Sequence, residues 1–150
     1  MKNKLSSLIF VVGVLQVILF SCKTSMVNSP LDYEKRAITF GKGGGFTGKE
    51  TSYVLLQNGQ LFEKKSDSVF VQVALIEKKL YKSLFADALS NKLDQIQCNK
   101  PGNMYYFVAY DDAKKKISNK ITWGDANAQL ESKVKEFYKE INKLIPQDNQ

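Results

Sequence analysis

Histidine is absent from this chain of 150 residues, and cysteine occurs only twice. Without histidine the chain cannot form a Ser-His-Asp or Cys-His catalytic centre or a histidine-ligated zinc site. Two cysteines are too few for a cysteine-rich zinc site or a disulfide framework. Three prolines and nine glycines exclude a collagen-like or low-complexity chain. We therefore expect one globular domain with no metal site, no cofactor and no enzymatic activity.

Long apolar runs are also scarce, because residues 8–20 form the one extended example. This uncharged run follows two lysines and is typical of a secretory signal, whereas a membrane-spanning helix needs about 20 residues. At its end Ser21 directly precedes Cys22, and Leu19 lies three positions before Cys22. This arrangement resembles the lipobox of bacterial lipoproteins. The resemblance implies cleavage after Ser21, a diacylglyceryl group on the Cys22 thiol and palmitate-type acylation of the new amino terminus. An ordinary cleaved signal and an uncleaved anchor are the alternatives.

The lipobox and the composition divide the chain into four parts. Residues 1–21 form a lipoprotein signal peptide, and residues 22–32 are polar and form a lipid-anchored tether. Residues 33–146 form a single α+β domain, and residues 147–150 are a polar tail. Because the tether is short, the domain should lie near a bilayer. We expect a lipid-anchored protein of the bacterial cell envelope, at the outer membrane.

Hydrophobic periodicity predicts the elements of the domain. The expected strands are residues 36–40, 51–57, 61–62, 104–110 and 117–123, and the expected helices are residues 77–91 and 126–145. Residues 69–73 form either another strand or the lead into the first helix. Asn58-Gly59 predicts a type I′ hairpin turn between two strands, and residues 99–103 predict another turn. This order favours an α+β fold, with an antiparallel sheet of four to six strands and two amphipathic helices on one face.

Both expected helices have an apolar stripe. In the first, Leu80, Leu84 and Ala88 recur every four residues and should face the core. In the second, the apolar positions alternate between spacings of four and three and include Phe137. Asp125 is placed to cap the start of this second helix.

A glycine-rich segment between the first two strands is the candidate functional loop. Together with Lys49 it matches the GxxxxGK pattern of a phosphate-binding loop, but Glu50 stands where that motif needs Ser or Thr. The residues that follow favour a strand, whereas a phosphate-binding loop opens a helix. We interpret the loop as a structural connection with Phe46 packed into the sheet, or as a partner-binding edge. Its candidate partner-binding residues are Gly43, Gly44, Gly45, Phe46, Thr47 and Gly48.

Aromatic residues gather in the last expected hairpin. They are Tyr105, Tyr106, Phe107, Tyr110 and Trp123. Since alternate residues of a strand face opposite sides of a sheet, one set should belong to the core. The other set either packs on the sheet or forms an exposed platform for a sugar or a protein.

Charged and reactive residues give weaker signals. The net charge is +7, and Lys114–Lys116 cluster in the expected turn of the last hairpin. These lysines are either solvated or attracted to anionic lipid headgroups, and no nucleic-acid motif accompanies them. Asp111 and Asp112 are adjacent and cannot face each other across a cleft as a glycosidase pair does. Cys98 has no histidine to activate it, so we expect a small buried residue there.

Four segments in combination resemble a group of small lipoproteins from Bacteroidota-type bacteria. They are Phe40–Gly48, Leu55–Gly59, Pro101–Phe107 and Ile121–Asp125. That group has no assigned activity, so the resemblance implies an envelope lipoprotein without implying a reaction. The segment Gly44–Gly48 and the element order are also similar to emfourin-type inhibitors of thermolysin-like metalloproteases.

The sequence as a whole predicts a non-enzymatic, lipid-anchored envelope protein that serves as a binding or structural module. Its expected partners are the membrane, through lipid on Cys22, and either a protein or anionic lipid headgroups, with no nucleic acid. The alternative is a periplasmic or surface protease inhibitor that acts through the glycine-rich loop.

Overall fold

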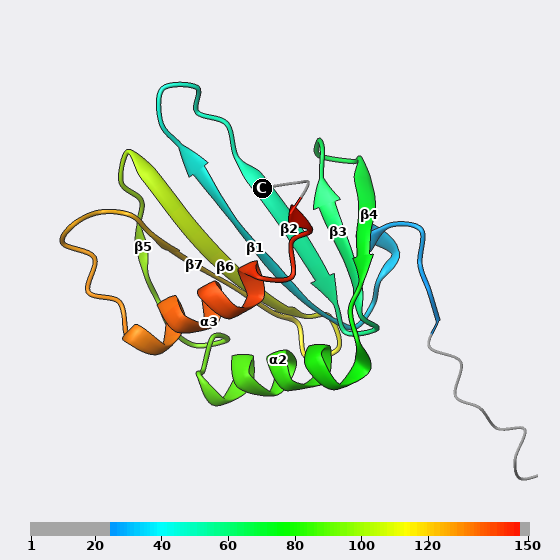
Figure 1. The fold of residues 1–150 in the computed structure, drawn as a ribbon. Helices are drawn as coiled ribbons and strands as arrows, with labels where there is room; N and C mark the ends of the chain where they lie inside the picture. The colour runs from blue at the N-terminus through cyan, green and yellow to red at the C-terminus, as the bar shows by residue number, and fades with distance from the viewer. Residues whose placement is uncertain (1–24, 148–150) are drawn as a thin grey trace, which may run out of the picture.

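The computed structural model describes residues 25–147, which form a strongly twisted sheet with two α-helices on it (Figure 1). The sheet has seven strands in the order β4-β3-β2-β1-β6-β7-β5. The strands are β1 (Arg36–Gly44), β2 (Thr51–Leu56), β3 (Gln60–Lys64), β4 (Phe70–Leu75), β5 (Asn99–Lys100), β6 (Met104–Asp112) and β7 (Ile117–Trp123). The helices are η1 (Pro30–Asp32), α2 (Lys78–Ser90) and α3 (Ser132–Asn142). The α+β class is confirmed.

The sheet is larger than predicted and is mixed. Six strands pair antiparallel, while β5 pairs parallel to β7, with Asn99 opposite Thr122. Residues 99–103 were expected to be only a turn, so β5 corrects that prediction. Its two residues carry no alternation that would reveal a strand, and their pairing is set by contact with β7. Cys98, expected to be buried, is half-buried, and its thiol donates to the Thr122 carbonyl at 3.4 Å.

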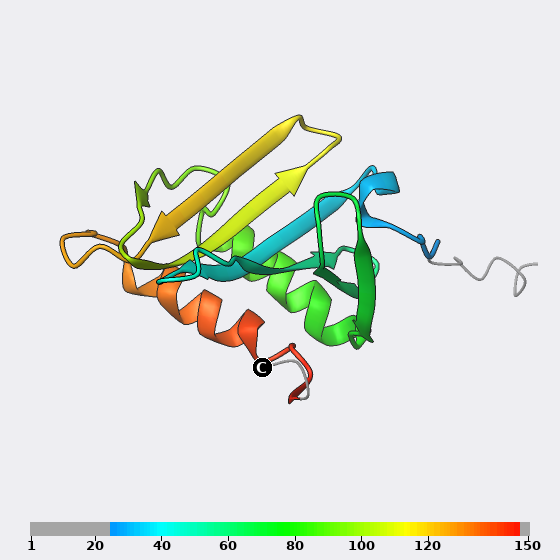
Figure 2. The same ribbon diagram turned by 90° about the horizontal axis from the view of Figure 1, so that it is seen from above.

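Both α-helices cover the same face of the sheet (Figure 2). Helix α2 buries Tyr81, Leu84, Phe85 and Ala88 against the sheet, and α3 buries Val134, Phe137 and Ile141. Leu80 was predicted to lie on the buried stripe of the first helix, but its side chain is 45% exposed. The apolar face is centred on Leu84 and Phe85 instead, because Tyr81 takes the inward position one turn earlier.

Helix α3 begins later than the sequence predicted. The side chain of Asp125 accepts a hydrogen bond from the backbone N–H of Asn127 at 2.6 Å and therefore closes a local turn. Glu131 stands at the N-cap of α3 without a side-chain hydrogen bond to the helix. Leu130 still packs against the core from the preceding loop. The apolar spacing thus extends beyond the helix because part of the loop is also held against the sheet.

The turn between β2 and β3 differs in type from the predicted type I′ turn. The N–H of Gly59 donates to the carbonyl of Leu56 at 2.9 Å, and Gly59 has φ = +94°. Among the described non-glycine residues, a left-handed φ occurs at Lys92 and Lys116, so Asn58 lacks the conformation that a type I′ turn requires. A single left-handed glycine therefore closes this hairpin.

Candidate functional site

The glycine-rich segment begins inside the sheet. Strand β1 continues as far as Gly44, and Gly41 and Gly43 lie opposite Phe107 and Tyr105 of β6. A Cβ atom on Gly43 would lie 2.6 Å from the hydroxyl oxygen of Tyr105, and one on Gly41 would lie 2.9 Å from the Phe107 ring. The two glycines are therefore needed because aromatic rings of the neighbouring strand cross over β1. The segment expected to be loop is strand up to residue 44.

The exposed part of the loop turns tightly on glycine. Gly44, Gly45 and Gly48 have φ values of +94°, +73° and +61°, which side-chain-bearing residues seldom adopt. The N–H of Gly45 donates to the Asn103 carbonyl at 2.7 Å, and the N–H of Gly48 donates to the Gly45 carbonyl at 3.1 Å. Phe46 lies between these bonds with a fully exposed side chain. The expectation that Phe46 packs into the sheet is wrong, because the turn directs its side chain away from the domain.

Glu50 holds the far side of this loop. Its carboxylate accepts a hydrogen bond from the hydroxyl of Tyr105 at 2.9 Å. That hydrogen bond raises the pKa of Tyr105, since an ionised phenol would lose it and face the carboxylate charge. Strand β2 begins at the next residue, Thr51, so the loop opens no helix. The GxxxxGK match therefore lacks the helix N-terminus that binds phosphate.

Apolar side chains continue from Phe46 onto β6. A Cβ atom on Gly45 would lie 2.9 Å from the sulfur of Met104, so the Met104 side chain lies beside the loop. Met104 is 48% exposed, and Tyr106, which points to the same side of β6, is 39% exposed. We call Phe46, Met104 and Tyr106 the Phe46 edge. The loop between β1 and β2, which contains Phe46, lies at the top of Figure 1.

An aromatic cluster supports this edge from the helix side of the sheet. The Tyr106 ring stacks on Trp123, with centroids 6.0 Å apart, and Tyr138 of α3 meets both rings edge-on at 5.5 and 5.3 Å. Burial raises the pKa of Tyr138 to about 12. Phe107, Tyr110 and Trp123 of the last hairpin are thus buried, whereas Tyr106, and in part Tyr105, also reach solvent.

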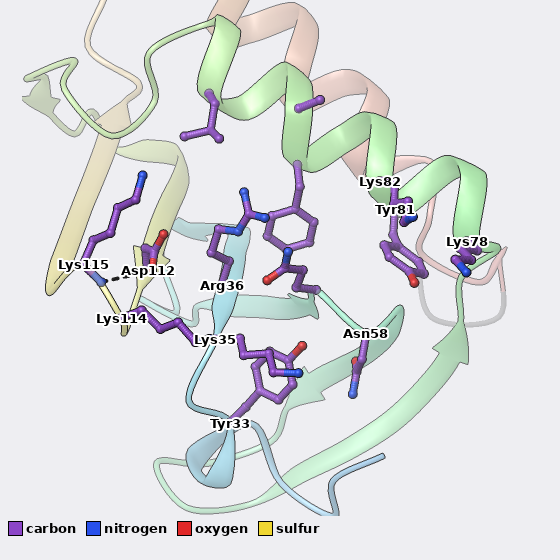
Figure 3. A pocket seen from close by; sticks show the side chains of 14 residues that line it. Tyr33, Lys35, Arg36, Asn58, Lys78, Tyr81, Lys82, Asp112, Lys114 and Lys115 are labelled. Carbon is purple, nitrogen blue, oxygen red and sulfur yellow. Dashed lines mark hydrogen bonds between the residues drawn. The ribbon is translucent and has the colours of Figure 1, made fainter. Parts of the chain in front are cut away.

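A basic cleft of about 1010 Å³ lies at the opposite end of the sheet, between α2 and the turns of two hairpins (Figure 3). Six cationic residues line it: Lys35, Arg36, Lys78, Lys82, Lys114 and Lys115. Among the described residues that line the cleft, Asp112 is the one carboxylate. Side chains of Tyr33, Tyr81, Phe85 and Leu89 supply apolar walls. The cleft therefore combines strong positive charge with apolar surface.

The cations of the cleft are largely free of acidic partners. The Arg36 guanidinium lies over the Phe85 ring, 5.9 Å from its centroid. Asp112 accepts a hydrogen bond from the backbone N–H of Lys115 at 3.2 Å and so closes the β6–β7 turn. Within residues 25–147, none of the six cations takes part in a salt bridge. Mutual repulsion would favour binding of anions there.

Two buried amide side chains dock the beginning of the described chain onto the sheet. Gln60 is 1% exposed; its side chain donates to the Val27 carbonyl and accepts from the Val27 N–H, both at 2.9 Å. The side chain of Asn58 donates to the Ser25 carbonyl at 3.0 Å. Val27 and Tyr33 also cover Val54, Leu56 and Phe62 on the face opposite the helices. From Ser25 onward, therefore, the segment predicted as a tether is held against the domain.

The predicted candidate residues of the glycine loop are consecutive in the chain and lie at one end of the sheet. Gly43 and Gly44 belong to the end of β1, and residues 45–48 form the turn beyond it. Cys22 lies outside the described residues. Of the Lys114–Lys116 cluster, two members line the basic cleft, which sequence reasoning did not identify. A usable signal was present in the first turns of α2, where Lys78 and Lys82 lie on one face and no acidic residue occurs.

Comparison with known proteins adds no family to this description. No protein-family model matches the chain, and no curated protein matches its sequence. Residues 25–147 contain no group of three or more metal-binding side chains. No helix in this same range is long and apolar enough to span a membrane.

Proposed function

We propose that this chain is a lipid-anchored, non-enzymatic protein of the bacterial cell envelope that binds a protein partner through the Phe46 edge. The observation that carries the proposal is the full exposure of Phe46 at the tip of a hydrogen-bonded loop. An exposed phenylalanine gains little for the fold, whereas aromatic residues often dominate the binding energy of interfaces.

The loop is also organised in a way that favours binding. Its base is held by the bond from Gly45 to Asn103, and its end is held by the bond between Tyr105 and Glu50. A loop that is already ordered loses less conformational entropy when a partner binds. Met104 widens the contact surface beside Phe46, and a thioether adapts readily to a partner's shape.

Site-specific photo-crosslinking tests the proposed edge in living cells. A photoreactive phenylalanine analogue is placed at position 46, and in a matched control at Val69, which is 50% exposed directly before β4. We expect an adduct of one defined mass from position 46 and none of that mass from position 69. The Glu50→Ala substitution, which removes the support from Tyr105, should weaken the adduct. Identical adducts from both positions would contradict a partner-binding edge at Phe46.

Inhibition of a thermolysin-like metalloprotease is a second candidate function, which rests on the resemblance of Gly44–Gly48 to emfourin-type inhibitors. The exposed, braced position of Phe46 favours it, because an inhibitor must offer an ordered side chain to a protease subsite. Titration of thermolysin with the purified protein measures it directly. We expect residual activity to fall with wild type and to recover with Phe46→Ala. Unchanged thermolysin activity at a molar excess of wild type would exclude this candidate.

A further inference from the structure

The chain that precedes the described domain is attached next to the basic cleft. The Ser25 carbonyl accepts its hydrogen bond from Asn58, and Asn58 also lines the cleft. Three residues of extended chain reach at most about 10 Å. If Cys22 carries lipid, as proposed above, the bilayer surface must therefore lie close to Asn58. The same end of the domain then faces the headgroups.

The cleft has the chemistry that such a surface requires. Its six cations and its apolar walls would meet phosphate groups and the upper acyl region respectively. Two further leucines project from this end, Leu31 of η1 at 66% exposure and Leu75 of β4 at 62%. Exposed aliphatic side chains beside lysine and arginine are typical of surfaces that contact the membrane interface.

Helix α2 begins at this cleft with lysine. Lys78 is its first residue and lies at the positive end of the helix dipole, where a cation is unfavourable. Glu77, at the N-cap, offsets part of this effect, and Lys82 lies one turn further on, where the dipole has little influence. An anion bound in the cleft would stabilise both lysines by charge pairing.

We propose that the basic cleft docks the domain onto the membrane by binding anionic lipid headgroups, so that the lipid anchor and the cleft hold one defined end of the protein against the bilayer. This inference rests on the proposed lipid anchor. It assigns a membrane-facing surface to Lys35, Arg36, Lys78, Lys82, Lys114 and Lys115. The Phe46 edge, at the opposite end of β1 and β6, then points away from the bilayer.

Lysine footprinting of the lipidated full chain tests this docking. The protein is reconstituted into vesicles of phosphatidylcholine alone, or of phosphatidylcholine with phosphatidylglycerol in a ratio of about 2:1 as an anionic surface. Vesicles are floated, treated with an acetylating reagent and analysed by mass spectrometry. We expect Lys78, Lys82 and Lys114 to be acetylated several-fold more slowly on the anionic vesicles. Exposed lysines of α3, Lys135 and Lys139, should be acetylated equally on both.

Paired charge reversals provide the matched control. Lys78→Glu with Lys82→Glu should abolish the protection of Lys114, and the helix should tolerate it because glutamate suits a helix N-terminus. Lys135→Glu with Lys139→Glu makes the same charge change at the same spacing on α3 and should leave the protection intact. Equal loss in both double variants would show a general charge effect and contradict a specific cleft.

The remaining outcomes separate this inference from the proposed anchor. A protein that does not float with neutral vesicles lacks the anchor, which contradicts the proposed function and this inference together. A protein that floats but shows the same acetylation on both vesicle types contradicts this inference alone. Protection of the cleft lysines by soluble glycerol phosphate on neutral vesicles, equal to that on anionic vesicles, would identify a site for free anions and overturn membrane docking.

Discussion

At the scale of single residues, Phe46 and Phe40 show two uses of the same side chain on neighbouring stretches of β1 and its loop. Phe40 is fully buried and stacks on Tyr53, with ring centroids 5.8 Å apart. Phe46 is fully exposed beyond the end of the strand. Successive side chains of a β-strand point to opposite faces of the sheet. Phe46 lies outside the strand, between glycines with left-handed φ values, so its direction does not follow this pattern.

Truncation of each phenylalanine should give opposite results. We expect Phe46→Ala to change the free energy of unfolding by less than about 0.5 kcal/mol, as exposed substitutions do. Phe40→Ala should lower it by about 3–5 kcal/mol, because burial is lost and a cavity forms. Urea unfolding of both variants measures the difference. A loss for Phe46→Ala close to that for Phe40→Ala would mean that the loop tip packs on the domain.

Tyr138 makes the stability depend on pH in the alkaline range. Burial raises its pKa to about 12 in the folded protein from 10.0, so the unfolded chain releases this proton first as pH rises. The stability from neutral Tyr138 is complete below pH 10 and is lost as pH rises toward 12. At pH 11.5, wild type should lose about 1 kcal/mol that Tyr138→Phe retains, a magnitude reduced by solvent screening because the Tyr138 side chain is only partly buried. Unfolding curves of both proteins at pH 9 and pH 11.5 test this prediction. An equal loss of unfolding free energy in both proteins would contradict a raised pKa for Tyr138.

At the scale of elements, helix α2 carries two leucines one turn apart, of which one is buried and the other is exposed. Leu84 is 5% exposed and Leu80 is 45% exposed. We expect Leu84→Ala to lower the free energy of unfolding by about 2–5 kcal/mol, the usual range for a buried leucine. Leu80→Ala should lower it by less than about 1 kcal/mol. Thermal unfolding of the two variants tests this prediction. Similar decreases in the melting temperature of both variants would indicate that α2 is rotated about its axis.

Local sequence was enough to predict most elements but not their extent. The α2 helix, the hairpin of β2 and β3, and the hairpin of β6 and β7 were expected because periodicity and turn residues are local signals. The two-residue strand β5 depends on β7, and the extension of β1 through glycine depends on the rings of Tyr105 and Phe107. Neither dependence is visible along the chain.

The candidate site was predictable to a similar degree. The glycine loop was located from its composition, yet the direction of Phe46 depends on φ values that no local pattern specifies. The basic cleft brings together residues from four separate parts of the chain, so the Lys114–Lys116 cluster gave only a fragment of it. Docking of Ser25 and Val27 depends on Asn58 and Gln60, two buried amides that resemble ordinary turn residues in sequence.

At the scale of the whole molecule, two surfaces lie at opposite ends of one sheet. The basic cleft lies at the end of the sheet where Arg36 of β1 pairs with Asp112 of β6, and the Phe46 edge lies at the other end, where Gly44 pairs with Met104. The buried amides of Asn58 and Gln60 shorten the free connection to Cys22. We propose that this arrangement fixes which end of the domain meets the bilayer and which end meets a partner.

Attachment of lipid to Cys22 is the claim on which this account depends most directly. Detergent phase separation of cells that express wild type or Cys22→Ser tests it, with intact mass measured on each purified chain. We predict that wild type enters the detergent phase and begins at Cys22 with added acyl mass, because acyl chains partition into apolar phases. Cys22→Ser should lack the acyl mass and should lose the detergent partitioning that wild type shows. Equal partitioning of both proteins, or a wild-type mass without acyl groups, would contradict the account.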